Sequence, residues 1–94
     1  MTTPVRLFPD FGARPPLWTD AGLFADAPLS PPLRKRLDRW ADVWEAECHP
    51  ATGWADEDRR TAWVEEGNAL AEAASEELGS LGFSVVADFA EEAG

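Results

Sequence analysis

The stretch from Ser30 to Cys48, SPPLRKRLDRWADVWEAEC, decides how this chain folds. Its large apolar side chains recur every three or four residues, the spacing that places them on one face of an α-helix. That stripe consists of Leu33, Leu37, Trp40, Trp44 and Cys48. Ser30 is a favourable N-cap, Pro31 suits the first helical position, and Pro50 stops the helix. We therefore expect a first helix over residues 33–49.

A second helix is expected over residues 56–78. Acidic residues fill its first turn, where the helix dipole favours negative charge. Its inward stripe consists of Trp63, Gly67, Leu70, Ala74 and Leu78. Gly67 costs the helix about 1 kcal/mol relative to alanine. We therefore predict that Gly67 makes room for a bulky ring of the first helix, either Trp40 or Trp44.

The segments on either side of the helices have strand patterns. Val5–Phe8 is typical of a short strand at the start of the proline-rich segment 1–32. Leu17–Phe24 has apolar pairs on both sides of a turn at Gly22, which predicts a small hairpin. Apolar and polar residues alternate over 83–89, a pattern typical of a half-buried strand.

The predicted fold class is α+β, in a single domain over residues 1–94. The order of elements is strand, hairpin, helix, helix, strand. We expect two antiparallel helices packed on one face of a small antiparallel sheet. In this arrangement the last strand runs antiparallel to the first and pairs with it.

Negative charge is concentrated in one half of the chain. The 94 residues have a net charge of −10, yet all eight bases precede residue 61, and residues 61–94 carry eight acids and no base. Such a surface repels phosphate backbones and anionic lipid and attracts basic partners. We therefore expect no direct nucleic-acid partner and no membrane partner. A single cysteine, the lack of a long apolar run and the lack of a secretory signal pattern favour a cytoplasmic location.

Few residues are arranged for chemistry. Cys48 and His49 are the only thiol and the only imidazole, and neighbours on a helix point about 100° apart, so they do not form a nucleophilic pair. A zinc site needs three or four ligands at defined spacing, and the sequence has no second Cys or His to provide them. Three loop carboxylates could serve an enzyme, but aspartate is also a common turn residue, which explains Asp10, Asp20 and Asp26 more simply. We therefore assign no catalytic residue, no cofactor and no metal.

Aromatic and acidic side chains are the better candidates for a binding site. Tryptophan is enriched at interaction hot spots. Trp18 and Phe24 lie in a short proline-bounded segment, and Trp54 lies between the two helices. The candidate partner-binding residues are Trp18, Phe24, Trp54, Glu65, Glu66, Glu72 and Glu76. The basic cluster Arg34–Arg36 with Arg39 is either a solvated face or a docking site, for an acidic partner or for the second helix of another copy in a homo-oligomer.

One segment resembles a known family. Arg6-Leu-Phe-Pro-Asp-Phe-Gly12, followed by Pro16-Leu-Trp18 and the spaced Trp40 and Trp44, resembles small uncharacterised actinobacterial proteins. Those carry an Arg-Leu-Phe-Pro-Asp-Tyr-Gly motif, then Pro-Leu-Trp, then a tryptophan-bearing helix; Phe11 replaces the tyrosine here. The resemblance implies a shared fold and no particular activity, so it assigns no functional residues.

Three functions remain. The leading hypothesis is a small, acidic, non-enzymatic protein-binding protein, in the form of an immunity or antitoxin-like inhibitor of a basic partner. A variant within this class is a DNA mimic that occupies a basic groove. The alternatives are a small enzyme that uses Asp10, Asp20 and Asp26 at an oligomer interface, and a purely structural subunit.

Overall fold

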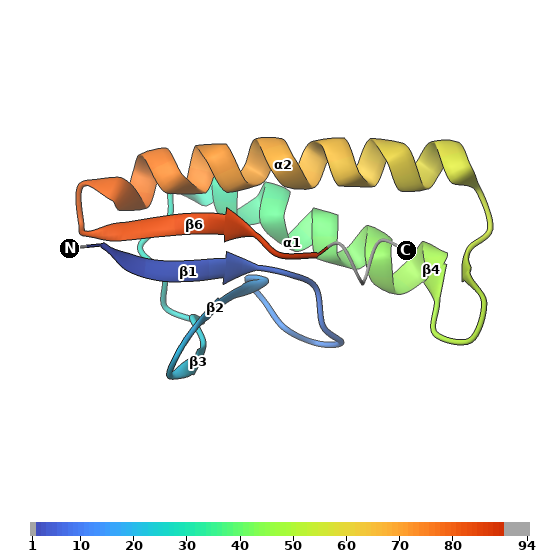
Figure 1. Cartoon of the computed structure of the whole chain (residues 1–94), viewed down its shortest axis with the longest axis horizontal. Helices are drawn as coiled ribbons and strands as arrows, with labels where there is room; N and C mark the ends of the chain where they lie inside the picture. The colour runs from blue at the N-terminus through green and yellow to red at the C-terminus, as the bar shows by residue number, and fades with distance from the viewer. Residues whose placement is uncertain (1, 90–94) are drawn as a thin grey trace.

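The computed structural model describes residues 2–89 and has an α+β fold, as predicted. Two long helices, one longer than the other, lie against a four-stranded sheet (Figure 1). The elements in chain order are β1 (Thr3–Leu7), β2 (Leu17–Thr19), β3 (Gly22–Leu23), α1 (Pro31–Glu47), β4 (Cys48–His49), β5 (Gly53–Trp54), α2 (Glu57–Gly79) and β6 (Phe83–Ala87).

The sheet is mixed, so the predicted antiparallel sheet is wrong in one pairing. The strand order is β3-β2-β1-β6. β2 is antiparallel to β1, but β6 is parallel to it, in a register that runs from Thr3 opposite Phe83 to Leu7 opposite Ala87. The reason is the path of the proline-rich segment, which brings the chain back alongside β1 as β2 before α1 begins. The helix pair then ends beside the start of β1, where β6 begins (Figure 1).

The predicted hairpin is confirmed. β2 and β3 are antiparallel, with Trp18 opposite Leu23 and Thr19 opposite Gly22. Gly22 has a φ of 110°, a conformation that glycine adopts at little cost. The two strands are joined by a two-residue turn, and β3 forms a short outer edge of the sheet.

The ends of α1 differ from the prediction in two ways. Ser30 is the N-cap residue, but its hydroxyl makes no capping bond; it donates instead to Glu77 Oε2 of α2, at 2.6 Å. The helix ends at Glu47, so the predicted end at residue 49 is wrong. Cys48 and His49 leave the helix as strand β4 and pair with Trp54 and Gly53 of β5. The pairing is closed by a turn that Gly53 permits with a φ of 74°.

Two tryptophans hold the helices together. Trp40 of α1 and Trp63 of α2 stack with ring centroids 4.3 Å apart and planes 5° from parallel. Each indole N–H donates to the backbone carbonyl of the other residue, at 2.8 Å and 2.9 Å. Both residues are buried, as is Trp44, so the assignment of these three tryptophans to the core is confirmed. The reciprocal bonds satisfy both indole donors inside the core.

Gly67 provides the close approach that the sequence predicted. A Cβ atom at Gly67 would lie 2.8 Å from Cζ2 of Trp40 and 2.6 Å from Cζ of Phe89. Trp40 is thus the ring opposite Gly67, and Phe89 is a second ring that the sequence did not indicate. Phe89 lies two residues beyond the end of β6, which is shorter than the predicted 83–89. It is buried, and its ring makes T-shaped contacts with both stacked tryptophans.

Candidate protein-binding surface

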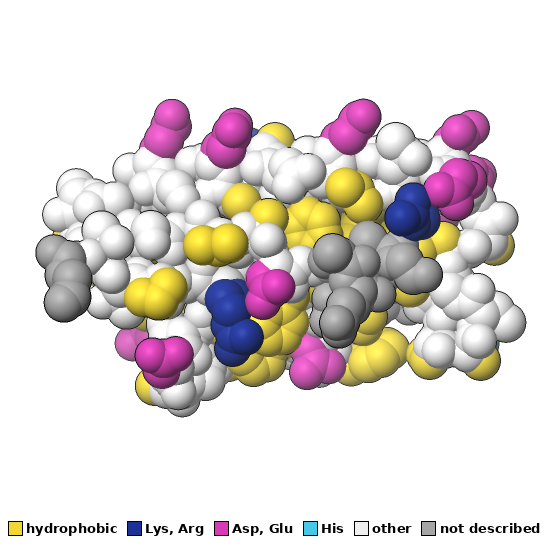
Figure 2. Space-filling model, viewed as in Figure 1, with side chains coloured by type: hydrophobic (Ala, Val, Ile, Leu, Met, Phe, Trp, Pro, Cys, Tyr) yellow, Lys and Arg dark blue, Asp and Glu magenta, His cyan; other side chains and the backbone are white. Residues whose placement is uncertain are grey.

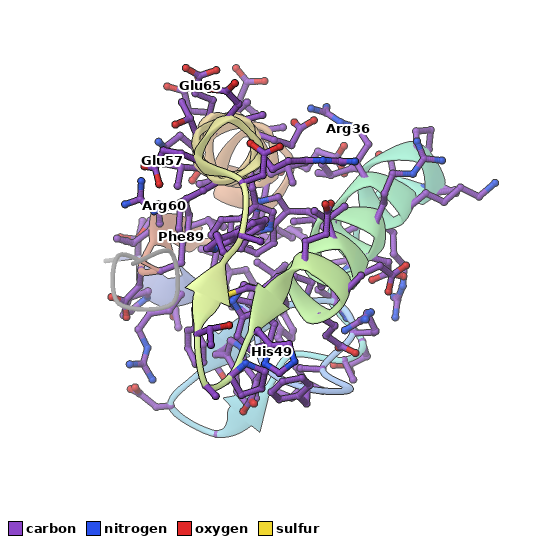
Figure 3. All side chains as sticks on the ribbon, turned by 90° about the vertical axis from the view of Figure 1, so that its right-hand side faces the viewer. Arg36, His49, Glu57, Arg60, Glu65 and Phe89 are labelled. Carbon is purple, nitrogen blue, oxygen red and sulfur yellow. The ribbon has the colours of Figure 1, made fainter. Side chains whose placement is uncertain are left out.

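The outer face of α2 carries a row of glutamates that we call the acidic ridge. It consists of Glu65, Glu66, Glu72 and Glu76, all exposed. Figure 2 shows acidic side chains along the upper edge of the molecule, over α2. Figure 3 shows Glu65 at the outer side of the helix, away from α1 and the sheet. The structure therefore places Glu65, Glu72 and Glu76 on the outer face of α2 and Glu66 at the flank of the ridge that faces α1.

Only one member of the acidic ridge is engaged within the part of the chain that the structure describes. Glu66 Oε1 pairs with Arg36 Nη2 at 2.8 Å, across the gap between the helices. Glu65, Glu72 and Glu76 make no ion pair or side-chain hydrogen bond to residues 2–89. Helix α2 has no base beyond Arg60. These carboxylates are therefore available to an external cation.

Of the three predicted aromatic residues, Trp18 and Phe24 lie on the two arms of the β2–β3 hairpin and Trp54 lies in β5. Each is half-buried. Trp18 in β2 stacks on Phe8 at 4.8 Å and donates its indole N–H to the Phe8 carbonyl at 3.0 Å. Phe24 follows β3 and packs against Phe83 at 5.2 Å.

Trp54 has a different environment from the other two. It lies in β5, with its ring 5.4 Å from that of Trp63. Its indole nitrogen is buried and has no hydrogen-bond partner among the described residues. All three aromatic residues thus contribute packing, and a role for them in binding stays a prediction.

Sequence reasoning missed the most exposed apolar side chains. Phe11 is 58% exposed, Leu81 57% and Val86 51%. Leu81 lies in the turn between α2 and β6, and Val86 lies on the uncovered face of the sheet. Phe11 had a usable signal, since it interrupts the turn Asp10-Phe11-Gly12, where polar residues are usual.

The loop that follows β1 contains the end of the Arg6–Gly12 motif and is hydrogen-bonded and ion-paired to α1. The Gly12 N–H donates to Glu45 Oε2 at 3.0 Å, and Gly12 has a φ of 76°. Arg14 pairs with Asp42 at 2.6 Å and with Glu45 at 2.9 Å. The bond from Gly12 and the guanidinium of Arg14 lower the pKa of Glu45. The motif therefore has a structural role in this chain.

Arg6 itself connects β1 to the residue that follows the edge strand β6. Its guanidinium lies 3.7 Å from the Asp88 carboxylate, just after β6, and 5.4 Å from the ring centroid of Phe8. Arg6 thus pairs with an acid just beyond the last strand.

The residues considered for chemistry are not arranged as a site. Asp10, Asp20 and Asp26 are exposed, and Asp10 accepts a hydrogen bond from the Phe11 N–H as a turn residue does. Burial raises the pKa of the Cys48 thiol, which disfavours the thiolate needed for nucleophilic attack. His49 is exposed at the β4 end of the molecule (Figure 3). Within residues 2–89, no group of three His, Cys, Asp or Glu side chains could hold a metal ion.

Neither α1 nor α2, nor any other helix in the described range, combines the length and the apolar character that crossing a bilayer requires. The charged ridge on α2 is one reason, because it places several carboxylates within a single helix.

Comparison with known proteins identifies a family. Residues 3–86 match a family described as Serratia CdiI immunity protein-like. The matched segment runs from the first residue of β1 into β6, so it includes both helices and the acidic ridge. A search of curated proteins gives no match. Because the family match spans well over half of the sequence, the chain belongs to the Serratia CdiI immunity protein-like family.

Proposed function

We propose that this chain is an immunity protein that inhibits a basic toxin by binding it through the acidic ridge. The observation that carries the proposal is the family match over residues 3–86. An immunity family fits the non-enzymatic protein-binding inhibitor expected from the sequence, and it favours neither a small enzyme nor a structural subunit.

The charge distribution supports a basic partner. The net charge of −10 produces a long-range field that attracts a cation-rich surface. The three unpaired glutamates of the acidic ridge, Glu65, Glu72 and Glu76, then provide local contacts at one face of α2. Such charges mainly raise the association rate and make binding sensitive to salt.

Other features of the chain extend the proposal to its location, origin and apolar contacts. The single cysteine of the sequence favours action in the cytoplasm. The resemblance of the Arg6–Gly12 segment to actinobacterial proteins supports an origin in such bacteria. Trp18, Phe24 and Trp54 are proposed as additional apolar contacts, because each is half-buried and keeps part of its ring accessible.

Affinity capture followed by a growth assay tests the proposal. The full chain is immobilised, extract of its source organism is passed over it at low ionic strength, and bound proteins are identified. Each captured protein is then expressed in a bacterial host with and without this chain. We expect one basic protein that arrests growth alone and is harmless when this chain is co-expressed. Capture of only harmless proteins, or growth arrest that persists with this chain in excess, would contradict the proposal.

A further inference from the structure

The outer side of the helix pair holds a groove whose charge is opposite to that of the whole molecule. The groove has a volume of about 420 Å³ and lies between α1 and α2. The buried, stacked rings of Trp40 and Trp63 form its floor. Val43 and Ala62 face it from the two helices; their small size leaves the space open.

Three arginines and one glutamate form the rim. Arg36, Arg39 and Arg59 are all exposed, and Glu66 is the single acid among the lining residues. Arg36 pairs with Glu66 at 2.8 Å, and Arg59 pairs with Glu47 at 3.1 Å. Figure 3 shows Arg36 between the two helices, on the side of α2 that faces α1. The rim therefore has an excess of positive charge in a chain whose net charge is −10.

Arg39 is the rim arginine for which no ion pair within the described residues accounts. It makes no ion pair and no side-chain hydrogen bond to residues 2–89. Lys35, one turn earlier on the same helix, places a like charge beside Arg39, which is mildly destabilising. A cation placed there without a partner contributes little to folding, so a binding role accounts for it better.

We propose that this groove receives an acidic side chain of the toxin that the acidic ridge binds. Arg39 supplies the unpaired guanidinium for the incoming carboxylate, and the tryptophan floor with Val43 and Ala62 contacts the apolar atoms beside it. The inference rests on the proposed function for the identity of the partner. It adds that the partner carries an acid within its basic face.

Charge complementarity selects this occupant. Glu66 belongs both to the acidic ridge and to the rim of the groove, so the two sites are adjacent parts of one surface. A partner must then match a negative ridge and a positive groove in the correct order, which rejects proteins that are merely basic. A second copy of this chain is a poorer occupant because two molecules of charge −10 repel each other.

A peptide titration tests the groove without any partner. The full chain, labelled with ¹⁵N, is titrated with the tripeptide acetyl-Leu-Glu-Leu-amide, and with its glutamine counterpart as the neutral control. We expect saturable shifts of the Trp40 and Trp63 indole N–H and Arg39 Nε–H signals with the glutamate peptide, and binding of the glutamine peptide weaker by at least about fivefold.

Two variants locate the effect. Arg39→Gln should weaken binding of the glutamate peptide by about fivefold, a typical value for losing a charge-assisted contact at an exposed site. Lys35→Gln is the matched control: it removes one exposed positive charge from the same helix but does not line the groove, and it should change binding by less than about twofold. Equal weakening by the two variants, or equal binding of the two peptides, would overturn the proposal.

Two further results separate this inference from the proposed function. With a captured toxin, Arg39→Gln should weaken the complex and Lys35→Gln should not; a toxin that is bound and neutralised equally by both variants would overturn the groove while leaving the proposed function intact. Concentration-dependent dimerisation that Arg39→Gln abolishes would assign the groove to a second copy and would also overturn the inference.

Discussion

Gly67 is the residue at which the packing of the core is tightest. The stacked pair of Trp40 and Trp63 leaves no room for a side chain on this turn of α2, and the ring of Phe89 closes the space from the other side. A Cβ atom at Gly67 would have three ring carbons within 2.9 Å. Rigid rings cannot move aside as a flexible side chain would, so the glycine is required by packing.

Gly67→Ala should therefore destabilise the protein despite its better helix propensity. The propensity gain is about 1 kcal/mol, and overpacking a core costs about 1 to 3 kcal/mol. With three contacts below 3.0 Å, we expect the free energy of unfolding to fall by about 1 to 2 kcal/mol in urea denaturation. The matched control is Gly79→Ala, at the end of the same helix, where an added Cβ would meet nothing within 4 Å. It should be neutral or slightly stabilising; an equal loss at both positions would argue against steric packing as the cause.

Residue patterns predicted one side of this contact and not the other. The step of three and four residues placed Trp40 and Gly67 on facing stripes, because helix periodicity fixes which side chains share a face. Phe89 could not be predicted in the same way. It lies beyond β6 and reaches the tryptophans only because β6 ends beside α2, which depends on the parallel pairing with β1.

At the scale of elements, Ser75 is what closes the free edge of the sheet. β6 is the last strand in the order, and such an edge offers unpaired backbone groups to other chains. Ser75 of α2 donates its hydroxyl to the Val85 carbonyl at 3.0 Å and accepts from the Val85 N–H at 2.9 Å. One side chain thus replaces a neighbouring strand at this residue.

Ser75→Ala should cost about 1 to 3 kcal/mol of stability, because it leaves a part-buried N–H and carbonyl without partners. Ser84→Ala, which removes a hydroxyl from β6 itself, is the control and should have little effect. Chemical denaturation gives the stabilities, and hydrogen exchange at the Val85 amide should become faster only in the Ser75 variant. If exchange at Val85 were unchanged, the hydroxyl would not be protecting the edge.

A second inter-element contact makes stability depend on pH. Glu77 accepts hydrogen bonds from the Ser30 hydroxyl at 2.6 Å and from the Ser30 N–H at 2.7 Å, and these bonds lower the pKa of its carboxyl. A carboxyl whose pKa is lower in the folded state contributes stability that is present above its unfolded pKa and is lost as the pH falls through the folded pKa.

Stability should therefore decrease on acidification, and Glu77→Gln should be less stable than the parent at neutral pH. The difference between the two should narrow as the pH falls below the ordinary range of a glutamate pKa. Glu76→Gln, at an exposed neighbour without a contact to the described residues, should leave the profile unchanged. Urea denaturation from pH 7 to pH 2 measures the effect; parallel profiles for the Glu77 variant and the parent would contradict it.

The sequence predicted most of the elements but not the direction of the last strand. Strand and helix patterns correctly indicated β1, β2, β3, both long helices and β6, because each has a local periodicity or turn residue. The direction of β6 has no local signal, since it depends on how the segment before α1 crosses the sheet. Likewise, Ser30 and Glu77 are 47 residues apart, so the sequence around Ser30 predicts an ordinary N-cap and gives no sign of the bond to Glu77.

At the scale of the whole molecule, charge is arranged by face. The molecule is about 39 Å long and roughly half as wide, and α2 lies along its long axis (Figure 1), so the acidic ridge runs lengthwise on one side. The basic residues of α1 border it across the groove. The sequence indicated the excess of acids and the basic cluster separately, but their adjacency follows only from the antiparallel packing of the helices.

Binding of the captured toxin to matched charge variants tests the proposed role of this surface most directly. Glu72→Gln/Glu76→Gln removes two charges from the acidic ridge, and Asp20→Asn/Asp26→Asn removes two exposed charges from the first third of the chain. If the ridge binds the toxin, the ridge variant should associate more slowly by about three- to tenfold at low salt and lose part of its salt dependence, whereas the loop variant stays within about twofold of the parent. Equal changes in the two variants would show that only net charge matters and would contradict the role of the acidic ridge.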